Sequence, residues 1–161
     1  MKIRLILTGG TIDKKYNELS GELDYTDTHI EKMLEQARSR ADLVIEKPML
    51  LDSFDMTEEQ CQQVLELCQA SEEDKIVITH GTDTMVQTAQ VLGKNVKGKT
   101  VVLVGSMIPY AFGYSDALFN LGSAITAVQC LGEGVYITMN GKIFDWDKVQ
   151  KNRELGEFQS A

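Results

Sequence analysis

The segment IVITHGTDT, residues 76–84, is the part of this sequence that decides the fold. Its first three residues are apolar and β-branched, as in a short strand buried on both faces of a parallel sheet. A turn rich in glycine and hydroxyl groups follows directly. Residues 5–12, LILTGGTI, repeat this arrangement near the N-terminus. Open α/β sheets bind ligands at the carboxyl ends of their strands, so the two turns are the first candidates for a functional site.

Strand-like and helix-like segments alternate along the rest of the chain. Short apolar runs predict strands at residues 2–8, 42–51, 75–79, 100–104 and 135–139. Apolar residues at helical spacing predict helices at residues 28–40, 57–70, 83–92 and 115–131. The second helix opens with a capping box, TEEQ at 57–60, and either Thr82 or Asp83 is expected to cap the third. Residues 12–24 are predicted to form a mobile loop, 142–149 a short strand or hairpin, and 152–161 a polar tail.

This alternation predicts a single α/β domain over residues 1–161, with an open, mainly parallel sheet flanked by helices. If the second strand pairs with the first on one side and the third pairs on the other, the strand order is 2-1-3-4-5, as in flavodoxin-like folds. The strand order then reverses between the first and third strands. The two glycine-rich turns follow those strands and would face each other across one crevice.

Composition limits the classes of partner. The 161 residues carry a formal net charge of −8 and contain no basic cluster, which argues against nucleic acid and anionic membranes as partners. No apolar stretch approaches the roughly 20 residues of a membrane span, and no signal peptide is visible. The three cysteines, Cys61, Cys68 and Cys130, form no metal-binding or redox motif, so we expect reduced thiols and a cytoplasmic protein.

Thr11 is the candidate nucleophile, because it follows a Gly-Gly turn that lets the backbone approach a ligand closely. A hydroxyl group needs a neighbouring base to attack a carbonyl group. The chain has only two histidines, His29 at the start of a predicted helix and His80 in the second turn, where it could serve the structure. A Ser/His/Asp type of triad is therefore not favoured, and Tyr16 or Tyr25, beside the first turn, is an alternative partner for Thr11.

The second turn supplies another set of groups. Thr82, Asp83 and a lysine would form a second pair of hydroxyl and base, while Asp83 could instead hold a substrate ammonium and Ser53 a carboxylate. Either turn by itself could also be structural, since HGTDT suits the start of a helix. A phosphate-binding loop is a further reading, but TGGT at 8–11 matches neither G-x-G-x-x-G nor the P-loop pattern.

Taken together, these motifs resemble the bacterial-type L-asparaginases. TGGTI at 8–12 is similar to the first catalytic motif of that family, and ITHGTDTM at 78–85 is similar to the second. Shorter matches follow in the same order along the chain: DYT at 24–26, DSFDM at 52–56, VGSMIP at 104–109, FNL at 119–121, MN at 139–140 and DWDKVQK at 145–151.

The resemblance implies catalytic roles at the matching positions. Thr11 would attack the side-chain amide carbon, helped by Tyr25. Thr82 would position or activate the nucleophile or a water molecule, with Lys151 as its basic partner. The reaction would be hydrolysis of L-asparagine to L-aspartate and ammonia through an acyl-enzyme, and it would need no metal or organic cofactor.

The resemblance also implies a substrate-binding set. Asp83 would bind the α-ammonium group and Ser53 the α-carboxylate, with Gly10, Gly81 and Thr82 lining the same site. The backbone N–H of Thr82, near the start of a helix, is a reasonable donor to an oxyanion.

Full-length members of the family carry a second, C-terminal domain, and the 161 residues correspond to the N-terminal catalytic domain only. We therefore expect a homo-oligomer, a dimer or tetramer, that covers apolar surface which the second domain would bury. Two other functions stay open. The chain could be a non-catalytic module that binds an amino acid or a protein, or a hydrolase of another amide, such as glutamine, D-asparagine, or a peptide- or nucleotide-linked amide.

Overall fold

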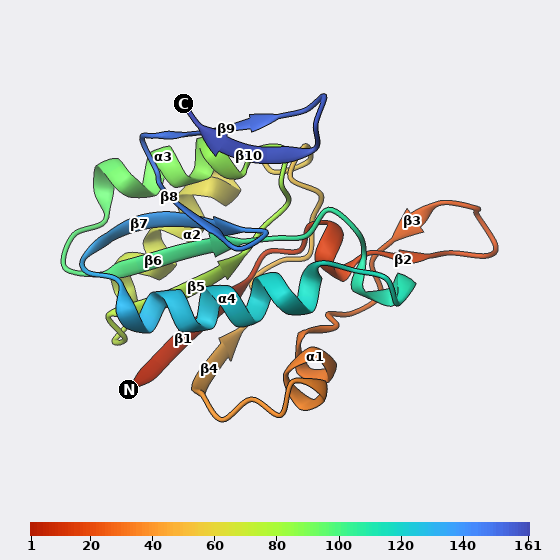
Figure 1. The fold of residues 1–161 in the computed structure, drawn as a ribbon, viewed down its shortest axis with the longest axis horizontal. Coiled ribbons are helices and arrows are strands. Elements are labelled where there is room, and N and C mark those ends of the chain that lie inside the picture. The colour runs from red at the N-terminus through yellow and green to blue at the C-terminus, as the bar shows by residue number, and fades with distance from the viewer.

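A six-stranded sheet forms the centre of the molecule in the computed structural model, which describes residues 1–161 (Figure 1). Its order is β4 (Asp42–Glu46), β1 (Lys2–Leu7), β5 (Lys75–Thr79), β6 (Thr100–Val104), β7 (Gly134–Met139) and β8 (Lys142–Asp145). The first five strands are parallel, so the predicted order 2-1-3-4-5 is confirmed. The sixth, β8, comes from the expected hairpin region and pairs antiparallel with β7 at the edge.

Two layers of helices cover the sheet. α1 (Ile30–Gln36) and α4 (Ala117–Cys130) lie on one face, and α2 (Glu58–Ala70) and α3 (Met85–Asn95) lie on the other (Figure 1). Side chains of a strand alternate between faces. In β5, Ile76 and Ile78 pack in the core beside α2 and α3, whereas Val77 packs in the core beside α1 and α4. Both faces of the strand are therefore buried, as its β-branched sequence predicts.

The starts of α2 and α3 differ in how well the sequence predicted them. Thr57 and Gln60 form the expected capping box, with each side chain accepting a hydrogen bond from the other residue's backbone N–H. The prediction that Thr82 or Asp83 caps the next helix is wrong, because α3 begins at Met85 with Thr84 in the N-cap position. The side chains of Thr82 and Asp83 contact Lys151 instead.

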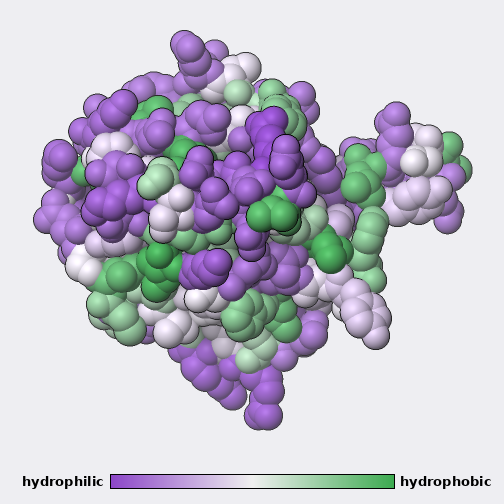
Figure 2. Space-filling view, turned by 45° about the horizontal axis from the view of Figure 1, so that its top comes forward, coloured by the Kyte–Doolittle hydropathy of each residue, from purple (hydrophilic) through white to green (hydrophobic).

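The N-terminal elements are shorter than predicted. The helix expected over 28–40 spans only 30–36, and the strand expected over 42–51 ends at Glu46, shortly before Pro48, which has no N–H to donate. The segment expected to be a loop begins with a 3₁₀ turn, η1 (Thr11–Asp13), and continues as a hairpin of β2 (Lys15–Tyr16) and β3 (Leu23–Asp24). This hairpin stands away from the body of the molecule (Figures 1 and 2).

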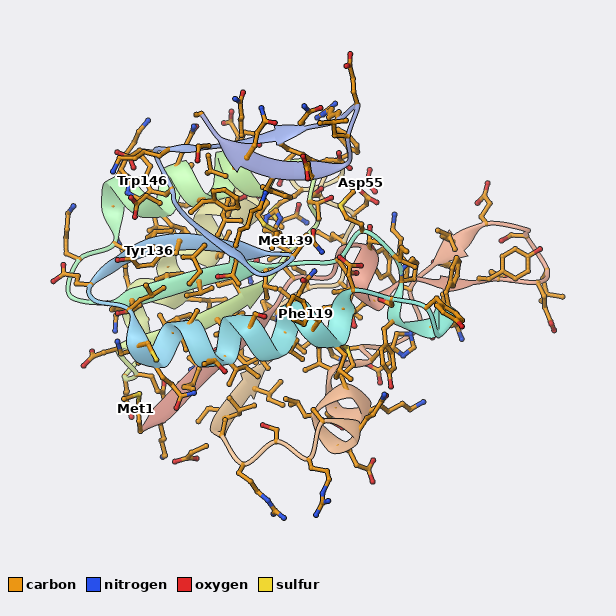
Figure 3. The ribbon with its side chains drawn as sticks, in the orientation of Figure 1. Met1, Asp55, Phe119, Tyr136, Met139 and Trp146 are labelled. Atoms are coloured by element: carbon orange, nitrogen blue, oxygen red, sulfur yellow. The ribbon has the colours of Figure 1, made fainter.

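The expected polar tail is the largest error in the predicted fold. Residues 149–160 form a second hairpin, β9 (Val149–Asn152) and β10 (Glu157–Ser160), on the face covered by α2 and α3. Val149 and Phe158 anchor it, since both are buried in that core. Trp146, on the connection from β8, lies against α3 at Gly93 (Figure 3). Two apolar anchors in a polar segment are too few to show a strand period, which is why the pattern was missed.

None of the helices combines the length and the apolarity that crossing a membrane requires.

Candidate active site

Three turns meet at the carboxyl ends of β1 and β5. Gly10 has φ 86°, and a Cβ atom there would lie 2.4 Å from the backbone nitrogen of Gly81. A Cβ atom at Gly81 would in turn lie 2.6 Å from Oγ of Ser53. Both contacts are closer than any side chain permits, so only glycine fits. The turns that carry Thr11, Ser53 and Thr82 are thus packed together at these two glycines.

Lys151 links two of the predicted site residues. Its Nζ donates hydrogen bonds to Oγ1 of Thr82 and to Oδ1 of Asp83, both at 2.8 Å. The Lys151 side chain is only 11% exposed and that of Asp83 32%, so water screens the ion pair incompletely. A cation within hydrogen-bond distance favours the ionised form of a hydroxyl group. The arrangement therefore suits activation of a nucleophile or water at Thr82.

Thr11 and Tyr25 are left without hydrogen-bond partners. Thr11 opens the 3₁₀ turn η1 and is partly exposed, and its hydroxyl group forms no hydrogen bond within the chain. The hydroxyl group of Tyr25 is buried and also unpaired. Burial raises the pKa of Tyr25, and the charge of Asp52 raises it further. Tyr25 is therefore protonated at neutral pH and can donate a hydrogen bond to a group in the crevice.

Ser53 presents a second unpaired hydroxyl group. The residue is 2% exposed and its Oγ has no partner, although its carbonyl oxygen accepts a hydrogen bond from Oγ1 of Thr84 at 2.9 Å. A buried hydroxyl group without a partner is costly in a folded protein. Its position against Gly81, beside the turn of Thr82 and Asp83, makes it available to an anionic group of a ligand.

Comparison with known proteins agrees with this geometry. A family profile described as "Asparaginase, N-terminal" matches residues 2–160. The chain belongs to the asparaginase family. L-asparaginase 1 of Escherichia coli is 38% identical over 161 aligned residues, which cover 92% of this chain and 47% of that protein. Glutaminase-asparaginase of Pseudomonas aeruginosa is 32% identical over 160 residues, covering 91% of this chain and 44% of that protein.

The fold is also that of a solved asparaginase. The thermostable L-asparaginase from Thermococcus kodakarensis has a TM-score of 0.87 to this chain at 32% identity, and the match covers 99% of this chain and 51% of that one. This asparaginase-family chain thus spans about half the length of the relatives it matches.

His80 of this asparaginase-family domain serves the structure of the second turn rather than the chemistry of the site. The ring is fully buried; Nδ1 lies 2.7 Å from the carbonyl oxygen of Gly81 and Nε2 lies 2.9 Å from Oγ1 of Thr88. A carbonyl oxygen only accepts, so Nδ1 carries the proton and Nε2 accepts from the Thr88 hydroxyl group. Burial lowers the pKa of His80 to about 4, so the ring is neutral at pH 7. The ring holds the turn that carries Thr82, and both of its nitrogens are bonded within the chain rather than directed at a ligand.

The buried neutral ring predicts a pH dependence of stability. His80 has a lower pKa in the folded chain than its ordinary value of 6.5, so protons bind the unfolded chain preferentially and stability falls as pH drops from about 6.5 towards 4. The loss due to this residue is expected to reach about 3 kcal/mol near pH 4. Urea unfolding at pH 7.0, 5.5 and 4.5 measures it. His80→Gln should show a shallower decline between pH 6.5 and 4.5 than the parent, and equal slopes would exclude His80 as the cause.

Asp13 and Lys14 were missed by the sequence analysis. They follow the TGGTI motif, and the side chain of each binds a segment that carries a site residue. Lys14 forms an ion pair with Asp52, the residue before Ser53. Burial alone would raise the pKa of Asp52, but the hydrogen bond and charge of Lys14 outweigh it and hold the pKa below its usual value. The only feature of the sequence that could have indicated their role is the position of two charged residues directly after the TGGTI motif.

A groove elsewhere on the molecule lacks the groups that a hydrolysis reaction needs. It has a volume of about 440 Å³ and runs between α1 and α4, on the side of the sheet rather than at the strand ends. Arg40 is the only titratable side chain that lines it. Hydroxyl groups, a lysine ammonium and a carboxylate occur together at the turns of Thr11 and Thr82, and this groove offers no such set.

Proposed function

We propose that this chain is an amidohydrolase that converts L-asparagine to L-aspartate and ammonia through a threonine acyl-enzyme. The observation that carries the proposal is the Lys151–Thr82–Asp83 arrangement, which lies on a turn packed against the turn of Thr11. The names of the related proteins, L-asparaginase and glutaminase-asparaginase, support it.

The groups of the site suit the two halves of such a reaction. Oγ1 of Thr11 would bond to the amide carbon, and its proton would pass to the leaving nitrogen, which departs as ammonia. Tyr25 stays protonated, so its part is to hydrogen-bond and relay this proton rather than to act as an ionised base. Water would then cleave the ester, giving aspartate and free Thr11. Thr82, held by Lys151, would position or activate the nucleophile or that water.

The remaining predicted residues would hold the substrate. The carboxylate of Asp83 attracts an α-ammonium group, and the unpaired hydroxyl group of Ser53 can donate to an α-carboxylate. The backbone N–H of Thr82 donates to no other group of the chain and is a candidate donor to the oxyanion. Gly10 and Gly81 would line the same site, because their close contact holds the two turns side by side. Residues 1–161 would form one catalytic domain, located in the cytoplasm.

Ammonia release from L-asparagine by the purified chain tests the proposal. Turnover that disappears in Thr11→Val supports an asparaginase that uses Thr11. No turnover in either protein, with aspartate still raising the melting temperature, would support a module that binds amino acids without catalysis. Turnover of another amide in preference to asparagine would keep the mechanism and change the substrate. L-glutamine is the first to compare, since one relative is named for both activities.

We also propose that the chain forms a homo-oligomer, a dimer or tetramer. α4 contains no charged residue, and Phe119 on its outer side is 62% exposed (Figure 3). Ile143 of β8, which is 49% exposed, lines the same shallow surface as Phe119. Most of the face drawn in Figure 2 is hydrophilic, with apolar residues in separate patches. Two copies that each have a formal net charge of −8 repel each other, so they associate best through uncharged surface. Analytical ultracentrifugation at micromolar concentration is expected to show an oligomer, and a monomer would contradict this.

A further inference from the structure

Asp13 closes the base of the segment that carries Tyr25. Its carboxylate is fully buried, and Oδ1 accepts hydrogen bonds from Oγ1 of Thr28 and from the backbone N–H of His29, both at 2.8 Å. Residues 14–27 form the hairpin of β2 and β3 and the irregular segment that follows it. The bonds of Asp13 therefore join the 3₁₀ turn that begins with Thr11 to the chain just after Tyr25.

Lys14 contacts the same segment from the other side. Its ammonium group lies 5.9 Å from the centre of the Tyr25 ring and forms the ion pair with Asp52. A cation at this distance from an aromatic ring is attracted to it. Lys14 thus connects three parts of the site: the turn of Thr11, the loop of Ser53 and the ring of Tyr25. It is also well shielded, with its side chain 18% exposed.

We propose that Asp13 and Lys14 are positioning residues that hold the segment of Tyr25 at the turn of Thr11. The inference rests on the proposed amidohydrolase function. Ordering the hairpin costs conformational entropy, and the contacts of Asp13 and Lys14 offset part of that cost. The hydroxyl group of Tyr25 is buried, which agrees with a segment that these contacts hold against the body of the domain.

The state of Asp13 supports a role beyond folding. Oδ2 is buried and has no partner, and burial is the main cause that raises the pKa of this carboxyl group. An apolar residue would fill the same space without that desolvation cost. The two hydrogen bonds of Oδ1 are what a carboxylate adds here, and both go to the end of the Tyr25 segment.

A double-mutant cycle with Tyr25 tests the proposal. Asp13→Ala is expected to lower kcat by about 10-fold or more, while Tyr25→Phe lowers it by about 100-fold. The double variant should be no slower than Tyr25→Phe alone, because Asp13 acts through Tyr25. Asp13→Asn keeps an oxygen acceptor for Thr28 and His29 and should retain most of the activity. Losses that multiply in the double variant would overturn the proposal.

Hydrogen exchange tests the positioning without depending on turnover. The amides of residues 15–27 should exchange faster in Asp13→Ala and in Lys14→Met than in the parent, and should stay protected in Asp13→Asn. Lys15→Met is the matched control for Lys14, since Lys15 makes no ion pair. If Asp13→Ala does not fold, Thr28→Val removes one of the two donors and should raise exchange in the same segment.

The two measurements separate the two proposals. If the parent shows no amide hydrolysis but exchange rises as described, the proposed function fails and the positioning contacts stand. If the parent hydrolyses asparagine and exchange over residues 15–27 is unchanged in Asp13→Ala and Lys14→Met, the positioning proposal is wrong and the proposed function stands.

Discussion

Replacing Thr11 with valine is expected to lower asparagine hydrolysis by about 10³-fold or more. Valine matches threonine in shape but has no hydroxyl group, so the acyl-enzyme cannot form. Thr11 is partly exposed and its hydroxyl group is unpaired in the chain, so the stability of the fold should change by less than about 1 kcal/mol. Ammonia release under saturating asparagine measures the loss, and urea unfolding checks that the fold is intact.

Thr126→Val is the matched control for Thr11→Val. Thr126 is exposed on α4, away from the strand ends, and should keep full activity. Aspartate should still raise the melting temperature of Thr11→Val, since Asp83 and Ser53 remain. Substantial turnover in Thr11→Val would show that another residue, with Thr82 the first candidate, is the nucleophile.

Replacing Lys151 with methionine is expected to lower kcat by about 10²–10⁴-fold, the usual contribution of a positioned acid or base. The change removes the only cation bonded to Thr82 and leaves Asp83 without its partner. Because the Asp83 side chain is one-third exposed, water compensates in part, and the stability loss should stay near about 1 kcal/mol. Steady-state kinetics with asparagine, compared with unfolding in urea, separate these two effects.

Lys148→Met is the matched control for Lys151. Lys148 lies three residues earlier, its side chain is 70% exposed, and it pairs only with Asp145. Its replacement should leave kcat and KM unchanged. Lys151→Met with near-parental kcat would remove Lys151 from the mechanism and leave Thr82 to act without a basic partner.

Local sequence patterns were sufficient for much of this protein. The β-branched runs at 76–79 and 100–104 predicted the parallel strands, because burial on both faces demands such residues. The alternation of strands and helices predicted a parallel sheet with right-handed crossovers, and the observed pairing of β4 and β5 on opposite sides of β1 gives the order 2-1-3-4-5. This order brings the turns of Gly10 and Gly81 to one edge of the sheet, and the close packing of these two glycines explains why glycine is needed at both positions.

Several features depended on contacts between residues far apart in the sequence. Thr82 and Asp83 have the residue types of a helix cap, yet their side chains bind Lys151, which lies 69 and 68 positions away. The polar segment after residue 148 gave no sign of a strand, because its pairing depends on the burial of Val149 and Phe158 against α2 and α3.

The sequence by itself determined the parallel sheet and the identity of the polar groups at its edge, since these follow from local periodicity and turn chemistry. Only the tertiary structure decided how those groups are held. The hairpin of β9 and β10 brings Lys151 to Thr82, and the buried carboxylate of Asp13 ties down the segment of Tyr25. The physical reason is that hydrogen bonds and ion pairs between distant segments depend on where packing places each segment, and local residue patterns do not record that placement.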